Sequence, residues 1–148
     1  MPRAANNPAI GYRFGVEIDG ITEGRFTECS GLEAKIDVEE YKEGGVNDFV
    51  HRLPGRRSFG TITLKRGLYA STQLWDWLNR TATVDAKNDQ IKNFSIVLYD
   101  LEGAEYMRWN LIGAFPVKWS AAGFQAADSS VSLETLELTY QEFTMQAS

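Results

Sequence analysis

The sequence is poor in the residues that most enzymes use for metal binding and nucleophilic chemistry. Its 148 residues include one cysteine, Cys29, and one histidine, His51. A single cysteine excludes an intramolecular disulfide, and these two residues cannot complete the four ligands of a structural zinc site. No nucleophile with an orienting partner lies near His51 in the sequence. We interpret His51 as a loop residue and Cys29 as a buried, inert thiol, and we predict no cofactor and no enzymatic activity.

Cationic residues are also scarce. Lysine and arginine number 15 against 20 acidic residues, which gives a net charge of −5. This balance disfavours a dedicated binder of nucleic acid, because such proteins concentrate an excess of positive charge on one face. The sequence contains neither a glycine-rich phosphate loop nor a pair of carboxylates placed for acid–base catalysis. Glu39 and Glu40 are neighbours on a strand and point to opposite faces, and we interpret Glu134 and Glu137 as solvated sheet residues.

Long apolar runs are absent as well. No stretch approaches the roughly 20 apolar residues that a membrane-spanning helix requires, and the first residues lack the apolar core of a secretory signal. We therefore expect synthesis in the cytoplasm and no stable membrane insertion. The composition, 43% hydrophobic and 24% charged, is that of a globular chain. We predict one domain over residues 12–148, preceded by a polar N-terminal arm over residues 1–11.

Alternation of apolar and polar residues dominates what remains and predicts half-buried strands. A polar face opposite a packed face is typical of antiparallel sheets that meet water on one side. Residues 94–99 are apolar on both faces and predict a central strand. The strands are expected near residues 12–18, 25–30, 36–41, 60–65, 94–99, 107–111, 117–119 and 131–140.

One amphipathic helix is expected over residues 71–80. Leu74, Trp75, Trp77 and Leu78 fall on one face of it, and the other face is polar. We expect this apolar face to lie across an open sheet and seal it.

The last strand has an irregular pattern. Its apolar residues are at odd positions up to Leu133 and at even positions from Leu136 onward. A β-bulge near Glu134 and Thr135 would account for this change of phase.

Residues 42–58 show no clear periodicity and predict a long loop, which in a compact domain is usually functional. Apolar residues rimmed by arginine are typical of protein interfaces. Two alternatives remain, a loop that folds back on its own core and a weak contact of the arginines with nucleic acid. The residues that we predict at an oligomer interface are Phe49, Val50, Arg52, Leu53, Arg56 and Arg57.

Eight segments stand in a characteristic order along the chain, namely residues 12–20 (YRFGVEIDG), 30–33 (SGLE), 40–45 (EYKEGG), 53–56 (LPGR), 63–67 (TLKRG), 74–77 (LWDW), 109–110 (WN) and 114–119 (AFPVKW). Taken together, they resemble the tail-tube protein family of contractile phages and phage-derived contractile injection systems. The resemblance extends from about Tyr12 to Phe143 and depends on the order and spacing of the segments rather than on any one of them.

This resemblance implies a mainly β fold with two packed antiparallel sheets, like a sandwich or barrel, and one flanking helix. It also implies six-subunit rings that stack into a hollow tube inside a contractile sheath, with the loop over residues 42–58 reaching neighbouring protomers. The implied partners are other copies of the chain, the sheath, baseplate and terminator proteins, and a protein or DNA cargo. The particle would be assembled in the cell and could then be released.

A shared barrel also gives the polar alternation a physical purpose, because closure removes open strand edges and the channel wall must be wet. The alternation alone equally fits the outer surface of a monomeric sandwich. The residues that we predict to face the channel are Lys35, Asp37, Glu39, Thr61, Thr63, Lys65, Lys118, Glu137, Thr139 and Gln141, with Ser120 beside them.

Two alternative functions stay open at this point. One is a tube-initiating paralogue that joins the tube to the baseplate. The other belongs to a different class, a free-standing β-sandwich that binds a small ligand, and it predicts an apolar pocket inside the monomer.

Overall fold

The structure is a computed structural model that describes residues 11–21, 26–41, 51–68, 70–83, 90–126 and 132–147. The predicted N-terminal arm, except for Gly11, lies outside the described residues. The described chain forms nine strands and one helix, which are β1 (Arg13–Ile18), β2 (Glu28–Ser30), β3 (Ala34–Tyr41), β4 (His51–Phe59), β5 (Ile62–Gly67), α1 (Gln73–Thr81), β6 (Lys92–Tyr99), β7 (Glu105–Ala122), β8 (Leu133–Thr139) and β9 (Glu142–Ala147).

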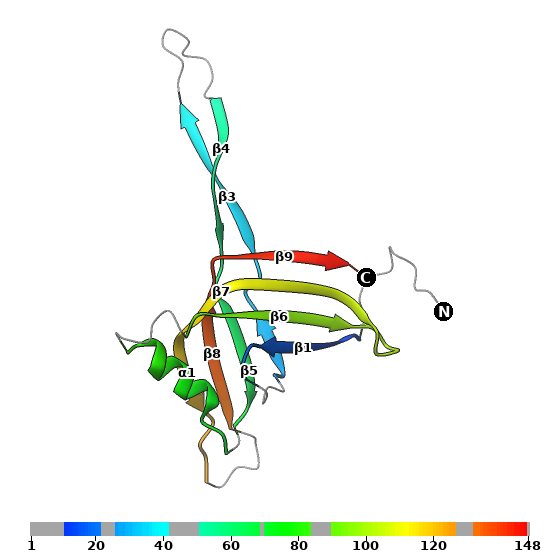
Figure 1. Cartoon of the computed structure of the whole chain (residues 1–148), viewed down its shortest axis with the longest axis vertical. Helices are drawn as coiled ribbons and strands as arrows, with labels where there is room; N and C mark the ends of the chain where they lie inside the picture. The colour runs from blue at the N-terminus through cyan, green and yellow to red at the C-terminus, as the bar shows by residue number, and fades with distance from the viewer. Residues whose placement is uncertain are drawn as a thin grey trace.

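Seven of these strands form one antiparallel sheet that curls because its longest strand bends. The order is β1-β6-β7-β8-β5-β2, and β9 also pairs with β7. The first part of β7 pairs with β6 and β9, and residues 115–122 pair with β8. Gly113, with a φ of +70° that favours glycine, lies between the two parts, and a register shift between Pro116 and Lys118 follows at the start of the second part. The mainly β fold with one helix is confirmed, and its two expected layers are two halves of one curled sheet joined through β7 (Figure 1).

The core lies inside this curl, where both halves and α1 contribute apolar side chains. Strand β5 follows the expected alternation, since Ile62 and Leu64 are buried and Thr63 and Lys65 are partly exposed. Strand β6 is central as predicted, because β1 and β7 pair with its two edges. The fully buried aliphatic side chains are Ile62, Leu64, Leu74, Leu111, Leu136, Leu138 and Val97.

The predicted bulge at Glu134 and Thr135 is wrong. Strand β8 pairs with β5 without interruption from Leu133 to Leu138. Its inward residues keep one phase, because Glu134 is buried and Leu133 is exposed. The apparent change of phase arose from treating Leu133 as a core residue and Glu134 as a solvated one.

The prediction of a loop over residues 42–58 is also wrong in part. Residues 51–59 form β4, which pairs with β3 in a separate two-stranded sheet. In Figure 1 this hairpin, called the β3–β4 hairpin below, projects away from the curled sheet. Every residue of β3 is exposed, so this strand does not fold back onto the core. Residues 42–50 lie outside the described residues.

Helix α1 contacts β7 and buries Leu74 and Trp77, as expected. Ser71 Oγ accepts a hydrogen bond from the Gln73 N–H at 3.4 Å, ahead of the first turn. The expectation that Trp75 is buried with them is wrong, because 45% of Trp75 is exposed. No helix within the described ranges has both the length and the apolar character needed to span a membrane.

The two neighbouring tryptophans should differ sharply in their effect on stability. Trp77 is 2% exposed and its Nε1–H donates to the Gln90 carbonyl oxygen at 2.6 Å. Trp77→Ala should therefore lower the free energy of unfolding by about 3–5 kcal/mol. Trp75→Ala, the matched control on the same helix, should lower it by about 1 kcal/mol. Urea unfolding followed by circular dichroism measures both, and equal losses would contradict this assignment.

Candidate functional site

The first candidate surface is a polar face on one half of the curled sheet, carried by β2, β5, β8 and β7. Pairing places Ser30, Thr63, Glu137 and Lys118 in one row across the four strands. The next row contains Glu28, Lys65, Thr135 and Ser120. Because side chains alternate along a strand, the residues between these rows point to the opposite side and fill the core. The alternation in the sequence thus produces one wet face and one packed face. We call the eight residues of these two rows the polar face.

The charges on the polar face compensate one another. Lys65 Nζ lies 3.8 Å from Glu28 Oε2, and Lys118 Nζ lies 3.8 Å from Glu137 Oε2. These two pairs contribute no net charge, and the other four residues of the two rows are serines and threonines. Exposed pairs of this kind add little to stability. They leave a hydrophilic surface without strong attraction for a polymer of either charge.

Four of the residues that the sequence analysis predicts to face a channel lie on the polar face. Thr63, Lys65, Lys118 and Glu137 lie together on it. Thr139 continues the same side of β8 and pairs with Phe115, and Thr61 is exposed immediately before β5.

The remaining predicted channel residues lie elsewhere. Gln141 lies at the bend between β8 and β9, where its side chain contacts Gly113. Lys35, Asp37 and Glu39 lie on the β3–β4 hairpin, outside the seven-stranded sheet.

The second candidate surface is the β3–β4 hairpin, where four of the predicted interface residues lie. Arg52, Leu53, Arg56 and Arg57 are all exposed on β4. Arg52 Nε lies 3.4 Å from Glu40 Oε1, and Arg57 is 3.6 Å from a carboxylate oxygen of Glu142. Phe49 and Val50 lie outside the described residues.

The hairpin also exposes apolar residues that the sequence reading assigned to a packed face. Ile36 is 56% exposed and Val38 is 62% exposed. They lie on the same side of β3, with Arg57 and Pro54 as their partners on β4. His51, expected in a loop, is on β4 and its ring stacks on that of Tyr41 at a centroid distance of 5.2 Å. The hairpin therefore has apolar side chains but no core of its own.

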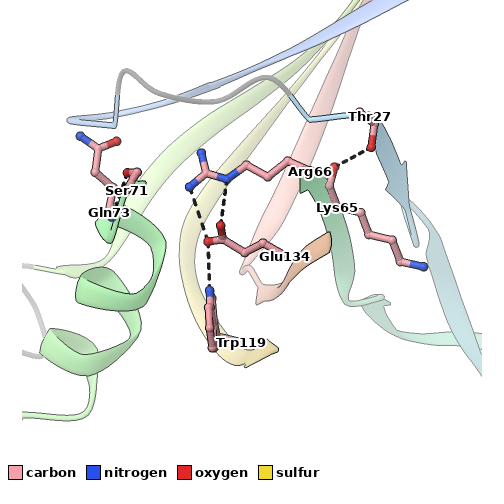
Figure 2. Close-up of polar contacts among 7 residues, drawn as sticks. All are labelled: Thr27, Lys65, Arg66, Ser71, Gln73, Trp119 and Glu134. Carbon is pink, nitrogen blue, oxygen red and sulfur yellow. Dashed lines mark hydrogen bonds and ion pairs between the residues drawn. The ribbon is translucent and has the colours of Figure 1, made fainter. Parts of the chain in front are cut away.

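A third feature, a buried ion pair, was missed by sequence reasoning. Arg66 is 0% exposed and Glu134 is 2% exposed. Arg66 Nε donates to Glu134 Oε2 at 3.3 Å, and Trp119 Nε1–H donates to Glu134 Oε1 at 3.0 Å. The Arg66 guanidinium also lies over the Phe26 ring, 5.6 Å from its centroid. Figure 2 shows the side chains of Arg66, Glu134 and Trp119 converging from β5, β8 and β7.

The shifted pKa values of Cys29, Tyr140 and Glu105 arise from burial or from hydrogen bonds within the fold. Burial raises the pKa of Cys29 to about 11, so the thiol is protonated at neutral pH, as expected of an inert cysteine. Burial also raises the pKa of Tyr140, whose hydroxyl donates to the Glu33 carbonyl oxygen at 3.3 Å. A hydrogen bond from Arg108 lowers the pKa of Glu105. Neither of the two pockets described next is lined by Cys29, Tyr140 or Glu105.

Two pockets of the described surface have polar linings. One, of about 220 Å³, is lined by α1 residues including Asp76 and Arg80 together with Gln90 and Lys92. The other, of about 250 Å³, includes Glu17, Asp19 and Asn93 in its lining. Neither is the apolar interior pocket that a ligand-binding sandwich predicts.

Comparisons with known proteins agree on one family. A family model described as T4-like virus tail tube protein gp19 matches residues 11–144. None of the curated proteins matches the sequence significantly.

Solved structures give the same result. A chain from the extended PVC sheath–tube complex of an extracellular contractile injection system is 29% identical, with a TM-score of 0.82, covering 97% of this chain and 94% of that one. A chain from the tube-terminating cap of the anti-feeding prophage is 26% identical, with a TM-score of 0.78 and coverages of 100% and 97%. Hcp1 from Salmonella typhimurium shares the fold, at 15% identity and a TM-score of 0.58 over 93% and 87% of the two chains.

Proposed function

Because the chain belongs to the family of the T4-like virus tail tube protein gp19, we propose that it builds the tube by forming six-membered rings that stack around a hollow channel. It is a tail tube protein of contractile injection systems, and its family is structural. We propose that it has no catalytic role. Its task is to supply a stiff conduit with a smooth bore, and the surrounding sheath supplies the work when it contracts.

The observation that carries this proposal is the polar face together with its two open ends. The half-sheet runs β7-β8-β5-β2. Among the described residues, no strand pairs with the outer edge of β2 or with the second edge of β7 over residues 115–122. Open edges of this kind invite pairing with another chain. Repetition of the half-sheet around an axis would close it into a barrel and turn the polar face toward the bore.

Strand direction supports the same closure. The four strands alternate in direction, since β2, β5, β8 and β7 pair antiparallel in turn. A cyclic rotation about an axis along the barrel preserves direction, so β7 of one copy meets β2 of the next in antiparallel orientation. An even number of strands per copy therefore gives an antiparallel barrel without a reversed junction.

The β3–β4 hairpin is the second element of the proposal. It projects from the body and exposes apolar and arginine side chains on two strands that no other described strand covers. We assign it to contacts with neighbouring protomers, in the same ring or in the next. We further propose that sheath, baseplate and terminator proteins are partners, that the cargo is a protein or DNA, and that the particle is assembled in the cytoplasm and then released.

Electron microscopy of the purified full-length chain tests the proposal. We expect stacked rings with a central hole, formed either at high protein concentration or after addition of native baseplates as seeds. Persistent monomers under both conditions would refute it. Copy number in the native particle separates the main tube from the initiator paralogue, because an initiator would occupy only the baseplate end. The polar linings of both pockets favour the tube over the ligand-binding sandwich.

A further inference from the structure

The two open ends of the half-sheet carry charges of opposite sign on the polar face. Lys118 is on β7, at one end, and Glu28 is on β2, at the other. Their side chains are 66% and 57% exposed, and each is more exposed than its partner inside the chain. The partners, Glu137 and Lys65, lie on the inner strands β8 and β5. Lys118 and Glu28 therefore each have an oppositely charged neighbour on the inner strand beside them. On the other side, each lies at an edge of the half-sheet with which no described strand pairs.

We infer that Lys118 of one copy pairs with Glu28 of the next copy across the seam of the ring. This inference rests on the proposed ring and names the residues that specify its junction. Placing β2 of the next copy beside β7 brings a positive and a negative charge together on the bore side. The sequence of charges Glu28, Lys65, Glu137 and Lys118 then alternates in sign around the whole bore. Two β7 edges brought together, or two β2 edges, would instead place like charges side by side, which disfavours a head-to-head dimer.

The other side of the same edge carries an aromatic pair. Trp75 contacts Trp119 of β7 in a T-shaped, edge-to-face arrangement, with ring centroids 5.5 Å apart. Trp119 is fixed in turn by its hydrogen bond to Glu134. Val117, the bulged residue beside Lys118, is also exposed. Trp75 is therefore a partly exposed tryptophan that is held by Trp119 beside the open edge of β7. Tryptophans in such positions are typical anchors of protein interfaces, and we assign Trp75 to the outer side of the seam.

Cysteine cross-linking tests the pairing directly in the full chain. In a Cys29→Ala background, the variant Glu28→Cys/Lys118→Cys should form disulfide-linked oligomers in a ladder after oxidation of assembled rings. The two cysteines lie on opposite end strands of the half-sheet, so a bond between them would join different copies. Glu137→Cys/Lys118→Cys is the matched control, because its cysteines are neighbours within one chain and should give a cross-linked monomer.

The outcomes separate the inference from the proposed function. Rings seen by electron microscopy without a ladder would overturn the seam and leave the tube intact. Absence of rings from the wild-type chain, with and without baseplates, would overturn both. A ladder that appears only in the Glu28→Cys/Lys118→Cys variant supports the seam.

Charge reversal gives a second, independent readout. Lys118→Glu should reduce the amount of assembled ring about tenfold or more, because it sets two carboxylates against each other at every junction. Adding Glu28→Lys in the same chain should restore assembly. A role of Lys118 confined to its own Glu137 would not be rescued by a change on β2, so failure of the rescue would contradict the inference.

Trp75 is tested by the same assay. Trp75→Ala should keep the circular dichroism spectrum of the fold and lose ring assembly, whereas Leu101→Ala, at an exposed turn between β6 and β7, should keep both. Assembly of the Trp75→Ala variant at the wild-type level would remove Trp75 from the seam.

Discussion

Glu134→Leu should lower the free energy of unfolding by about 3–5 kcal/mol, because it removes the carboxylate that pairs with a buried guanidinium. Arg66 is fully buried, and the carboxylate of Glu134 accepts hydrogen bonds from Arg66 and from Trp119. Leucine fills a similar volume but accepts neither bond. Urea unfolding of the purified monomer measures the loss, and the midpoint should fall with little change in the slope.

The control for this prediction replaces both members of the ion pair. Arg66→Met/Glu134→Leu removes the charge and its counterion together, so it should recover most of the stability lost in the single variant. The coupling between the two changes separates the pair from a simple packing defect. A loss of less than about 1 kcal/mol in Glu134→Leu would contradict a stabilising role of this carboxylate beside the buried guanidinium.

This ion pair also marks where sequence reasoning failed. Alternation located the core strands because Ile62, Leu64, Leu136 and Leu138 repeat at every second position. Glu134 and Arg66 continue the same two series, one step beyond the apolar residues. Charged residues are almost never fully buried unless paired, and the pair is 68 residues apart in the sequence. The sequence did contain a signal, because Glu134 is in phase with Leu136. The alternation was instead followed through Leu133, and the resulting change of phase was interpreted as a bulge.

The sequence analysis missed strand β4 of the β3–β4 hairpin for a different physical reason. Period-two alternation appears when one face of a strand is buried and the other is wet. Residues 51–58 include no fully buried residue, and they include Pro54 and Gly55, which weaken a strand prediction. Gly55 lies so close to the backbone of β3 that an added side-chain carbon would be 2.9 Å from the Asp37 carbonyl oxygen. The pairing thus depends on a close approach that residue type alone did not reveal.

The sequence did not predict the long, bent strand β7, for a third reason. Val117 and Trp119 were predicted on a strand that Pro116 separates from the preceding one, whereas β7 is continuous over 18 residues. Proline lacks the N–H that a ladder requires, so it is tolerated at an edge or a bulge. Pro116 is buried at the register shift on the side of β7 that faces β8. The same residue that suggested an interruption therefore marks the point where the sheet bends.

The largest effect on assembly should come from the apolar side of the β3–β4 hairpin. Ile36→Asp/Val38→Asp should abolish ring and tube formation and change the free energy of unfolding of the monomer by no more than about 0.5 kcal/mol. Both side chains are more than half exposed and lie on a hairpin that projects from the sheet, so the monomer gains little from them. An isolated two-stranded hairpin is marginally stable in water, and exposed apolar residues on it gain stability only when a partner covers them.

Analytical ultracentrifugation and electron microscopy measure the assembly of this variant, and urea unfolding measures its stability. Ile36→Thr/Val38→Thr is the matched control, because threonine keeps the branched shape and strand preference without adding charge, and it should weaken assembly less. Tubes from the aspartate variant at the wild-type level would remove the hairpin from the interface. A large loss of monomer stability would instead place these side chains in the core, against their exposure. Arg57 lies opposite Ile36 and is already 3.6 Å from Glu142, so the surface that a neighbouring copy must supply to cover this side is an apolar one.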